Sequence, residues 1–568
     1  MIEHKNWTFP YAVNPAFRKK VAYFSMEFAI HQALKIYSGG LGFLAGSHMR
    51  SAYELKQNVI GIGILWRHGY YDQTRDDHGY MGVQFQKKFY TFLKQTDVEF
   101  TIAIDGEDVK VKTYYLSPEE FGSAPLFLMT TDFPENSDKA RAYSNKLYDN
   151  YGENRIAQHM LLGIGGAKVV EKLGGADIYH MNEGHALPLC FYLLSQLKNI
   201  DAVRNKVVFT THTPEKAGNE EQQIDFLQRM NFFSNVPLEL VRHITNAEGD
   251  NLSYTPSALY MSKIANGVSK LHGAVSREMW KQYKGICSIT HITNAQNKKF
   301  WADKQFDRAF INRDVGEMIV LKKEMKRELF EVVANQTGKI FDPDVLTIVW
   351  ARRFAGYKRA NLIMRNKERF LQMLNNKKHP VQIIWAGKPY PTDHGAVNMF
   401  NDLISYTHGR NNCAVLVGYE ILLSYLLKRG SDVWLNTPRR PHEASGTSGM
   451  TAAMNGSINV SISDGWIPEF AKHGGNSFVT PVADHTKLSV EEIDNYDHEN
   501  IMNVLENEVI PAYYENGTKW KHIISNSMHD IYPFFDSDRM ATEYYQKIYN
   551  AEYNPVENLI KSALEGEG

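Results

Sequence analysis

The sequence predicts an α/β protein built from two doubly wound domains that face a cleft. Three observations predict this fold class: short β-rich apolar runs alternate with helical patterns, several of these runs are continuously apolar, and the alternation starts again near residue 345. Continuous apolar runs are typical of strands buried on both faces, as in parallel sheets covered by helices. The length of 568 residues also exceeds what one hydrophobic core organises.

The expected strands and helices follow from these runs in chain order. Strands are expected at residues 21–26, 60–65, 176–181, 206–212, 346–353, 381–387, 412–418 and 431–436. Helices are expected at residues 312–335, 415–429 and 534–549. The charged, helical region 303–340 precedes the second series of strands and resembles a connection. We therefore place an N-terminal domain at residues 1–310, a second domain at 311–520 and a C-terminal helical segment at 521–568.

Charge and cysteine content exclude several classes of protein. The 63 basic and 64 acidic residues give a net charge of −1, so no overall field favours nucleic acid or an anionic membrane. Cys190, Cys287 and Cys413 are far apart, which predicts neither a disulfide framework nor a zinc site and fits a reducing compartment. No apolar run approaches the roughly 20 residues of a membrane span, and the first residues lack the apolar core of a signal peptide. We expect a cytoplasmic protein.

A glycine-rich loop, IYSGGLGFLAGSHM at residues 36–49, is the first stretch with chemical character. Gly39, Gly40 and Gly42 let a ligand approach the backbone closely, and the residues after them have a helical pattern. A glycine-rich turn before a helix start is a phosphate-binding arrangement. The same glycines also suit an ordinary turn, and this loop alone leaves both interpretations open.

Two polar loops follow expected strands of the N-terminal half, HMNEGHALP at 180–188 and FTTHTPEKAGN at 209–219. Their polar side chains at the strand ends are those of His180, Asn182, Glu183, His185 and His212. A metal site in the first loop is conceivable, but the sequence supplies no convincing third and fourth ligand, so none is expected. The second loop combines hydroxyls with one imidazole, which suits sugar hydroxyls. A hydrogen-bonded structural histidine is the alternative.

A basic loop, WARRFAGYKRA at residues 350–360, follows another buried strand. Its cations are Arg352, Arg353, Lys358 and Arg359. A solvated charged surface is the usual origin of such a run. Here the cations begin at the carboxyl end of a strand, where ligands of doubly wound domains bind. Arginine forks and lysine charges suit phosphate oxygens, so we predict an anion site.

The stretch EASGTSGMTAAMNG, residues 443–456, combines hydroxyls with small residues and continues as a short helix. Its hydroxyls belong to Ser445, Thr447 and Ser448, and Gly446 and Gly449 leave room for backbone donors. A helix dipole favours an anion near the helix start. With the glycine loop and the basic loop, this stretch offers more anion-binding capacity than one phosphate needs. Two phosphates, or one diphosphate, would fill it.

These five loops, in this order, resemble the α-glucan phosphorylase family (glycogen, starch and maltodextrin phosphorylases), and the similarity is closest to its shorter bacterial branch. The resemblance runs from about residue 20 to residue 545. It is carried by YFSMEFAIHQALKIYSGGLGFLAG, LLGIGGAKVVEKLG, NEGHA, TTHTP, NGVSKLHGAVSREMW, HITN, ARRFAGYKRA, AGKPYP and DVWLNTPRRPHEASGTSGM. It implies two Rossmann-like domains around a deep cleft, which is the GT-B type glycosyltransferase fold.

The resemblance also implies a reaction and a cofactor. A hexosyltransferase of this family moves a glucosyl unit reversibly between the end of an α-1,4-glucan or maltooligosaccharide and phosphate, giving glucose 1-phosphate with retained configuration. Its pyridoxal phosphate assists proton transfer through the cofactor phosphate, while the aldehyde is tied to a lysine as a Schiff base. No metal, nucleic acid or membrane is expected as a partner. The sequence leaves open whether the chain forms a homo-oligomer.

Roles carry over from the resemblance one residue at a time. Those expected to act on the reacting groups are Arg353 and Lys358, which would hold the substrate phosphate, and His212, beside the glucosyl unit at the cleavage point. Those expected near the phosphates are Gly39, Gly40, Leu41, Arg352, Thr447 and Ser448. Those expected to bind the sugar are Glu183, His185, Glu443, Ser445 and Gly446.

Thr451 departs from the family pattern. The family sequence EASGTSGMK carries the pyridoxal phosphate lysine at this position, and a threonine cannot form a Schiff base. Two smaller departures accompany it: HITNGVH becomes HITNAQN, with Ala295 and Asn297, and AGHD becomes AGNE, with Asn219. The sugar and phosphate residues are thus kept while the cofactor anchor is lost.

Four hypotheses follow from this loss. Pyridoxal phosphate binds without a covalent tether, or phosphorolysis proceeds without it. In the third hypothesis the vacated pocket admits a nucleotide, and the enzyme is a sugar-nucleotide-dependent glucosyltransferase of the glucan synthase type. In the fourth the chain is a non-catalytic glucan-binding protein, which the retained cations argue against because unpaired buried charges cost stability. We take a phosphorylase-like glucosyltransferase as the leading hypothesis and the sugar-nucleotide enzyme as the alternative.

Overall fold

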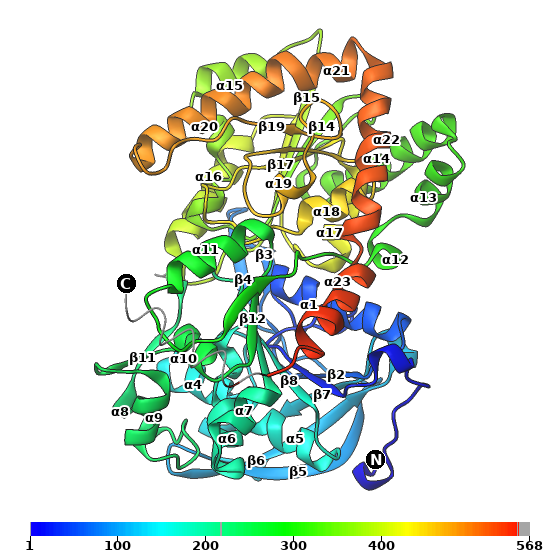
Figure 1. Ribbon diagram of the computed structural model, residues 1–568. Coiled ribbons are helices and arrows are strands. Elements are labelled where there is room, and N and C mark those ends of the chain that lie inside the picture. Colours follow the sequence, from blue (N-terminus) through cyan, green and yellow to red (C-terminus); the bar gives the residue numbers. More distant parts are fainter. Residues whose placement is uncertain (1, 216–217, 554, 556–568) are drawn as a thin grey trace. The chain divides into compact units, whose positions relative to one another are not determined.

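The computed structural model describes residues 2–215, 218–553 and 555 and divides into two compact units. The first unit comprises the described parts of Met1–Tyr71, Phe85–Thr293 and Ser537–Gly568. The second comprises Asp72–Gln84 and Asn294–Asp536. Each unit is α/β, with a sheet flanked by helices (Figure 1).

The first unit is built on a mainly parallel sheet. Among the described residues its strand order is β13-β12-β9-β8-β1-β2-β7-β6-β5. Neighbours from β13 to β7 pair in parallel, whereas β7, β6 and β5 pair antiparallel and form one edge (Figure 1). The strands are β1 (Val21–Phe24), β2 (Val59–Ile64), β5 (Lys94–Ile104), β6 (Glu107–Leu116), β7 (Leu126–Thr130), β8 (Ile178–Asn182), β9 (Val207–Thr210), β12 (Ile264–Gly267) and β13 (Ser288–His291).

Helices connect these strands. They are α1 (Gly40–Glu54), α2 (Pro118–Phe121), α3 (Asp138–Ala142), α4 (Gly152–Met160), α5 (Gly166–Lys172), α6 (Pro188–Leu197), α7 (Ile200–Lys206), α8 (Ile224–Arg229), α9 (Leu238–Thr245), α10 (Tyr254–Tyr260), α11 (Lys270–Trp280) and α23 (Ser537–Glu543). Shorter elements are the helical turns η1 (His4–Asn6), η2 (Pro15–Phe17), η3 (Leu161–Gly165), η4 (Gly184–Ala186) and η9 (Tyr544–Tyr549), and the pair β10 (Glu221–Gln223) and β11 (Asn251–Ser253). Side chains start several helices, as where the Ser269 hydroxyl accepts from the His272 amide at the start of α11.

The second unit contains a parallel sheet with the strand order β16-β15-β14-β17-β18-β19 among the described residues. These strands are β14 (Leu346–Ala351), β15 (Val381–Ala386), β16 (Cys413–Leu416), β17 (Val433–Asn436), β18 (Ile458–Ser461) and β19 (Phe478–Val479). The hairpin β3 (Asp72–Arg75) and β4 (Met81–Gln84) also belongs to this unit, because the Gln73 side chain donates to Gly387 O and the Arg75 side chain donates to Val415 O.

Helices cover this second sheet. They are α12 (Lys298–Trp301), α13 (Lys304–Ile311), α14 (Val315–Thr337), α15 (Lys367–Leu374), α16 (His394–Thr407), α17 (Ile421–Gly430), α18 (Ser448–Ala453), α19 (Ile467–Phe470), α20 (Val490–Val504), α21 (Ile510–Tyr514) and α22 (Gly517–Phe535). Helical turns are η6 (Gly356–Lys358), η7 (Leu362–Met364) and η8 (Leu505–Val509).

Three tryptophans of the second sheet join its core to the loops at the carboxyl ends of the strands. Trp350, Trp385 and Trp434 are fully buried on the neighbouring strands β14, β15 and β17. A buried indole N–H needs an acceptor. Here the acceptors lie in loops after the strands: the Thr437 hydroxyl for Trp350 at 2.9 Å and Ala360 O for Trp385 at 2.9 Å. The core therefore fixes the loops that follow it.

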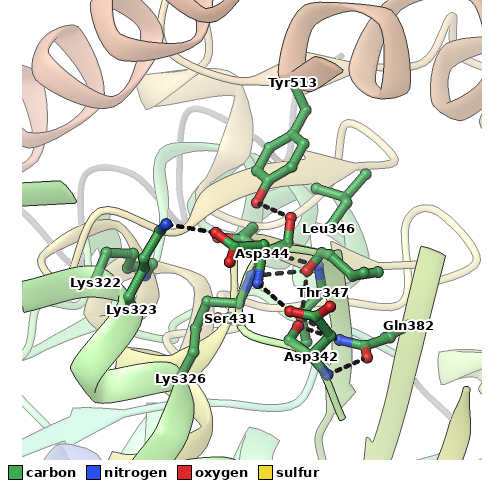
Figure 2. Close-up of polar contacts among 12 residues, drawn as sticks. Lys322, Lys323, Lys326, Asp342, Asp344, Leu346, Thr347, Gln382, Ser431 and Tyr513 are labelled. Atoms are coloured by element: carbon green, nitrogen blue, oxygen red, sulfur yellow. Dashed lines mark hydrogen bonds and ion pairs between the residues drawn. The ribbon is translucent and has the colours of Figure 1, made fainter. Parts of the chain in front are cut away.

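Buried lysines tie α14 to the opposite, amino-terminal ends of the strands (Figure 2). The Lys326 amine donates to Asp432 Oδ2 at 2.5 Å and to Val345 O at 2.8 Å. The same carboxylate accepts from the Thr347 amide at 2.9 Å. One turn earlier, the Lys322 amine donates to two backbone carbonyls, and burial lowers its pKa to about 7.

The structure confirms the predicted α/β class and all eight expected strands, as β1, β2, β8, β9 and β14 to β17. The expected helix at 312–335 is α14, but the helix expected at 415–429 begins only at Ile421, because β16 and a loop use the residues before it. The helix expected at 534–549 is interrupted at Asp536, whose backbone is extended, so α22 ends there and α23 follows.

The compact units divide the chain at places other than the expected boundaries 1–310, 311–520 and 521–568. Apart from the hairpin at residues 72–84, the second unit begins after Thr293, and the chain from Ser537 belongs again to the first unit. That return is fixed by buried hydrogen bonds, such as Tyr549 Oη with His180 Nδ1 at 2.8 Å and Ser537 with Ser51 at 2.6 Å. No helix in the described part of the chain combines the length and apolar character needed to cross a bilayer.

Candidate functional site

The glycine loop of the first unit is held by a carboxylate, that of Glu27, just after β1. Glu27 accepts from the amides of Ser38 and Gly39 at 2.6 and 3.1 Å and from the Ser38 hydroxyl at 3.0 Å. The Tyr148 hydroxyl donates to its other oxygen at 2.7 Å. Glu27 is only 2% exposed. Its charge therefore fixes the backbone of the loop that leads into α1.

The glycines of this loop serve two purposes. A Cβ on Gly42 would lie 2.6 Å from Glu27 Oε2, so internal packing requires a glycine there. A Cβ on Gly39 or Gly40 would meet no atom within 4 Å. Packing inside the chain thus does not explain these two glycines, and their bare backbone suits the close approach of a ligand. Leu41, expected beside the phosphates, is half-buried at the first turn of α1.

Parallel pairing brings Glu183 and His212 together, because they follow the neighbouring strands β8 and β9. Glu183 Oε2 accepts from the His212 amide at 2.8 Å and from the Thr213 hydroxyl at 3.3 Å, and Oε1 accepts from the Gly184 amide at 3.0 Å. Glu183 has a φ of +74°, which a non-glycine residue adopts at a cost. Burial raises the pKa of this carboxyl.

Hydrogen bonding fixes the tautomer of His212. The Ser25 hydroxyl donates to Glu27 O at 2.9 Å, so its oxygen must accept from the Asn182 amide nitrogen at 3.2 Å. The Asn182 oxygen therefore faces His212 Nε2, 2.7 Å away, and that nitrogen carries the proton. Burial lowers the pKa of His212 to about 3. The ring is thus neutral, and Nδ1 is an acceptor for a hydroxyl.

His185 follows Glu183 in η4 and lies in an aromatic environment. Its ring centre is 5.7 Å from that of Tyr148 and 5.4 Å from that of His159. Burial lowers the pKa of His185 to about 4, so this imidazole is also neutral. Tyr148 additionally binds the carboxylate of Glu27, which connects this loop with the glycine loop.

In the second unit, three charged side chains converge at the carboxyl ends of β14 and β17. Glu443 Oε2 lies 2.6 Å from Arg352 Nη2 and 3.3 Å from the Lys358 amine. All three residues are at least nine-tenths buried. Burial lowers the pKa of Lys358 to about 7, with a further decrease from Arg352 and an opposing effect of Glu443. Burial raises the pKa of Glu443, but Arg352 and Lys358 outweigh this effect and hold it below its usual value.

One carboxylate does not satisfy the guanidinium of Arg352. Its Nε and Nη1 atoms are buried and have no hydrogen-bond partner in the structure. The same is true of the hydroxyl of Ser445. Buried donors without partners are rare, because each loses its bonds to water. These groups therefore fit an anion or hydroxyl of a ligand. Arg353, the next residue, has an exposed side chain beside Tyr357.

The loop that carries Glu443 is held by a second buried carboxylate, Asp464. Its oxygens accept from the amides of Glu443 and Gly465, each at 2.9 Å. Burial raises the pKa of Asp464 to about 7, and the neighbouring Glu443 adds to the increase. Gly446 has a φ of +81°, and a Cβ there would lie 3.0 Å from Arg352 Nη2. Only glycine meets both conditions without strain.

The same loop continues into α18, a helix of six residues that starts at Ser448. Thr447 and Ser448 are half-buried, and the Ser448 hydroxyl accepts from the Trp434 indole N–H at 3.3 Å. Thr451 is only 1% exposed. Its hydroxyl donates to Ser448 O at 2.9 Å, inside its own helix. Position 451 therefore offers a buried methyl group and a hydroxyl that already has an acceptor.

The predicted residues thus form two groups. In the first unit Glu183, His185 and His212 lie together, and the glycine loop is connected to them through Tyr148 and Glu27. In the second unit Lys358, Glu443 and Gly446 lie around Arg352. Sequence reasoning missed the residues that position these groups, which are Glu27, Asn182 as the partner of His212, and Asp464.

The chemistry of the two groups is that of hydroxyl and anion binding. Neutral histidines and constrained carboxylates accept from hydroxyls, whereas Arg352 and Lys358 provide buried positive charge. In the described part of the chain, no group of three or more His, Cys, Asp and Glu side chains is arranged to hold a metal ion.

The sequence is similar to that of known proteins over both units. The family profile described as carbohydrate phosphorylase matches residues 298–503. The chain is 45% identical to the uncharacterized protein MJ1631 of Methanocaldococcus jannaschii, across 94% of this chain and 100% of that protein. It is 32% identical to a maltodextrin phosphorylase of Thermococcus litoralis, across 94% and 71% of the two chains. It is 30% identical to a glycogen phosphorylase of Aquifex aeolicus, across 94% and 86%.

Proposed function

Because the chain belongs to the carbohydrate phosphorylase family, we propose that it is a retaining glucosyltransferase that exchanges glucosyl units between the ends of α-1,4-glucans and phosphate. Glucose 1-phosphate is the phosphorylated product. The relatives named as maltodextrin and glycogen phosphorylases support an α-glucan as the other substrate.

The observation that carries this proposal is the state of Arg352. Arg352 is only 5% exposed, and two nitrogens of its guanidinium have no protein partner. Burying such donors costs about 1–3 kcal/mol each unless something binds them. Lys358 adds a second buried cation to the one carboxylate of Glu443. A phosphate would supply the missing acceptors and the missing negative charge.

Each group then has a task in the reaction. Lys358 and Arg353 hold the substrate phosphate, and the buried cations stabilise charge that develops as the glycosidic bond breaks. With a pKa of about 7, Lys358 is protonated more fully when a phosphate dianion lies beside it. His212 Nδ1 and the carboxylates of Glu183 and Glu443 accept from sugar hydroxyls, which orients the glucosyl unit.

Pyridoxal phosphate, which the family implies, fits this site in one part and not in another. The free nitrogens of Arg352 and the hydroxyls of Thr447 and Ser448 suit its phosphate. Thr451 cannot bind its aldehyde, since a hydroxyl forms no Schiff base and this one donates to Ser448 O. When bound, the cofactor would supply a phosphate that assists proton transfer at the substrate phosphate.

Thr451 also supports a second candidate donor, a sugar nucleotide. A threonine occupies less space than a lysine, and a diphosphate would use the same cations that two separate phosphates use. The enzyme would then be a sugar-nucleotide-dependent glucosyltransferase on the same acceptor. This candidate keeps the roles of His212 and Glu183 and changes only the donor.

A donor comparison tests both candidates. Glucose 1-phosphate and sugar nucleotides are offered separately with a maltooligosaccharide, and phosphate release and chain growth are measured. We expect transfer from glucose 1-phosphate and a loss of about 100-fold or more in Arg352→Met. Arg365→Met is the matched control, because Arg365 pairs with Glu491 at the surface. Transfer from sugar nucleotides alone would replace the leading proposal with the second one.

A further inference from the structure

The β3–β4 hairpin contributes a buried side chain to the second unit, that of Gln73, which is 6% exposed. A backbone carbonyl can only accept and an amide N–H can only donate, so the neighbours of this side chain fix its orientation. Its nitrogen donates to Gly387 O at 2.9 Å, and its oxygen accepts from the Gly418 amide at 3.0 Å. Gly387 follows β15 and Gly418 follows the neighbouring strand β16. Gln73 therefore joins two loops at the carboxyl ends of the strands.

The first of these loops lies against the backbone of Arg352. A Cβ on Gly387 would be only 1.8 Å from Arg352 O, so the two backbones are in direct contact. The Arg352 amide also donates to Ala386 O at 3.1 Å. Because close packing leaves no space for independent movement, a shift of Gly387 must displace Arg352. The hydrogen bond from Gln73 to Gly387 O therefore helps to determine the position of Arg352.

The second loop reaches the same strand end through Tyr419, which follows Gly418 and is 6% exposed. The Tyr419 hydroxyl donates to Ala351 O at 3.4 Å, one residue before Arg352. It accepts from the Ser424 hydroxyl at 3.3 Å, which leaves its proton for Ala351 O. Burial raises the pKa of Tyr419 to about 12, whereas the Ser424 hydroxyl and the charge of Arg352 oppose this increase. Both loops that Gln73 joins therefore contact the segment that carries Arg352.

We propose that Gln73 is a positioning residue of the anion site. By holding the Gly387 and Gly418 loops, it keeps the Arg352 guanidinium directed at a bound phosphate. The guanidinium is a planar fork, so its hydrogen bonds to phosphate oxygens depend on its direction, and a displacement of about 1 Å is costly. This inference rests on the proposed function, because it assigns a support to the cation that would bind the phosphate. Gln73 acts through the backbone of Arg352 and not on a reacting group.

Gln382 provides a matched control near the opposite, amino-terminal end of β15. It is also buried, at 5% exposure. Its nitrogen donates to Asp342 O at 3.0 Å, and its oxygen accepts from the Asp342 amide at 2.7 Å (Figure 2). Both glutamines thus bind backbone groups of the second unit through both ends of the side-chain amide. If Gln73 only stabilises the fold, the loss of either glutamine should have the same effect on phosphate binding.

The test compares Gln73→Met and Gln382→Met, which keep the length of the side chain and remove its hydrogen bonds. The dissociation constant of inorganic phosphate is measured by titration calorimetry on the full-length protein, with chloride at matched ionic strength. Both variants should lose stability. Gln73→Met should bind phosphate roughly 10- to 100-fold more weakly than the wild type, as when a charge-assisted hydrogen bond is misdirected. Gln382→Met should stay within about twofold of the wild type, because distant sites act independently.

A second measurement needs no variant. Coupling between two sites is reciprocal, so phosphate bound by Arg352 should stabilise the loops that position this residue. In the wild type, phosphate should therefore slow hydrogen exchange of the Gly418 amide, which Gln73 accepts, more than that of the Asp342 amide, which Gln382 accepts.

Equal phosphate affinity of Gln73→Met and the wild type would overturn the inference and leave the proposed function standing. Equal weakening in both variants would also overturn it, because a general loss of stability would then explain the result. A wild type that binds no phosphate would overturn the inference, and the donor comparison decides independently on the proposed function. If Gln73→Met fails to fold, the exchange measurement on the wild type decides, and equal slowing of both amides overturns the inference.

Discussion

Replacing Glu443 by glutamine tests whether the buried cations of the second unit form an anion site. Glu443 is the carboxylate that faces both Arg352 Nη2 at 2.6 Å and the Lys358 amine at 3.3 Å. Glutamine keeps the shape and removes the charge. Removing one partner of a buried ion pair costs about 3–5 kcal/mol, because the remaining charge is left uncompensated.

For Glu443→Gln we expect a loss of free energy of unfolding at the lower end of this range. Lys358 has a pKa of about 7 even with Glu443 present, so without that charge it loses its proton readily. Arg352 then remains as the uncompensated charge. A loss of about 3 kcal/mol corresponds to a decrease of roughly 6–12 °C in melting temperature for a unit of this size.

The diagnostic result is the response to phosphate. A phosphate dianion should replace the missing carboxylate, so phosphate should stabilise Glu443→Gln more than the wild type. At a phosphate concentration of about 100 times Kd, binding raises the free energy of unfolding by about 2.7 kcal/mol. The assay is thermal unfolding in a phosphate series with chloride at matched ionic strength.

Asp432→Asn is the control for this experiment. It breaks a pair of similar burial, Lys326 with Asp432 at 2.5 Å, which lies before β17 whereas Glu443 lies after it. It should lose stability as well, but phosphate should not restore it. Equal responses of the wild type and both variants to phosphate would refute the anion site at Arg352.

Three further changes test how the two groups are positioned. Glu27→Gln removes the charge that holds the glycine loop, and hydrogen exchange at its loop amides should become about 10- to 100-fold faster, since such bonds contribute about 1.5–3 kcal/mol each; unchanged exchange would contradict this role. Gly387→Ala places a Cβ 1.8 Å from Arg352 O at a φ of +148°. The free energy of unfolding, measured in urea, should therefore fall by more than about 2 kcal/mol, and phosphate binding should weaken. Wild-type values for both quantities would argue against this strain. Acid should destabilise the first unit, because burial lowers the pKa of His48 to about 3 and that of His272 to about 4. Stability is therefore lost as the pH falls below 6.5, the pKa of a histidine in the unfolded chain, by about 2 kcal/mol per histidine at pH 5. A urea midpoint that does not change between pH 7 and pH 5 would exclude this.

The sequence predicted β1, β2, β8, β9 and β14 to β17 because burial on two faces leaves a local signal. VIGIGI in β2 and VQIIWA in β15 are apolar throughout, and each is one central strand of a parallel sheet. The antiparallel edge was missed although a signal exists. Asp105 and Gly106 both have positive φ between β5 and β6, as an Asp-Gly hairpin turn requires, and both strands alternate in burial.

The positioning residues could not be predicted from the sequence, for a physical reason. The amide that Asp464 binds lies 21 residues before it in the chain, and the Asn182 oxygen that orients His212 lies 30 residues away. The hairpin at residues 72–84 joins the second unit through a hydrogen bond between residues 314 positions apart. Such bonds depend on the pairing of strands, and no local pattern of residue types records them.

A lysine at position 451 and the buried cations would act on different atoms of a ligand. The absence of the lysine from this chain is therefore independent of the presence of the cations. A lysine there would bind an aldehyde, whereas Arg352 and Lys358 act on negatively charged oxygens. If the anion had been lost together with the lysine, Arg352 would remain buried with two unsatisfied nitrogens and nothing to offset their cost. The glycine of φ +81° beside it and the carboxylate that fixes its loop would also serve no purpose. The arrangement therefore supports the proposal of a site that keeps its anion, and under this proposal the change at Thr451 concerns how the rest of that ligand is attached.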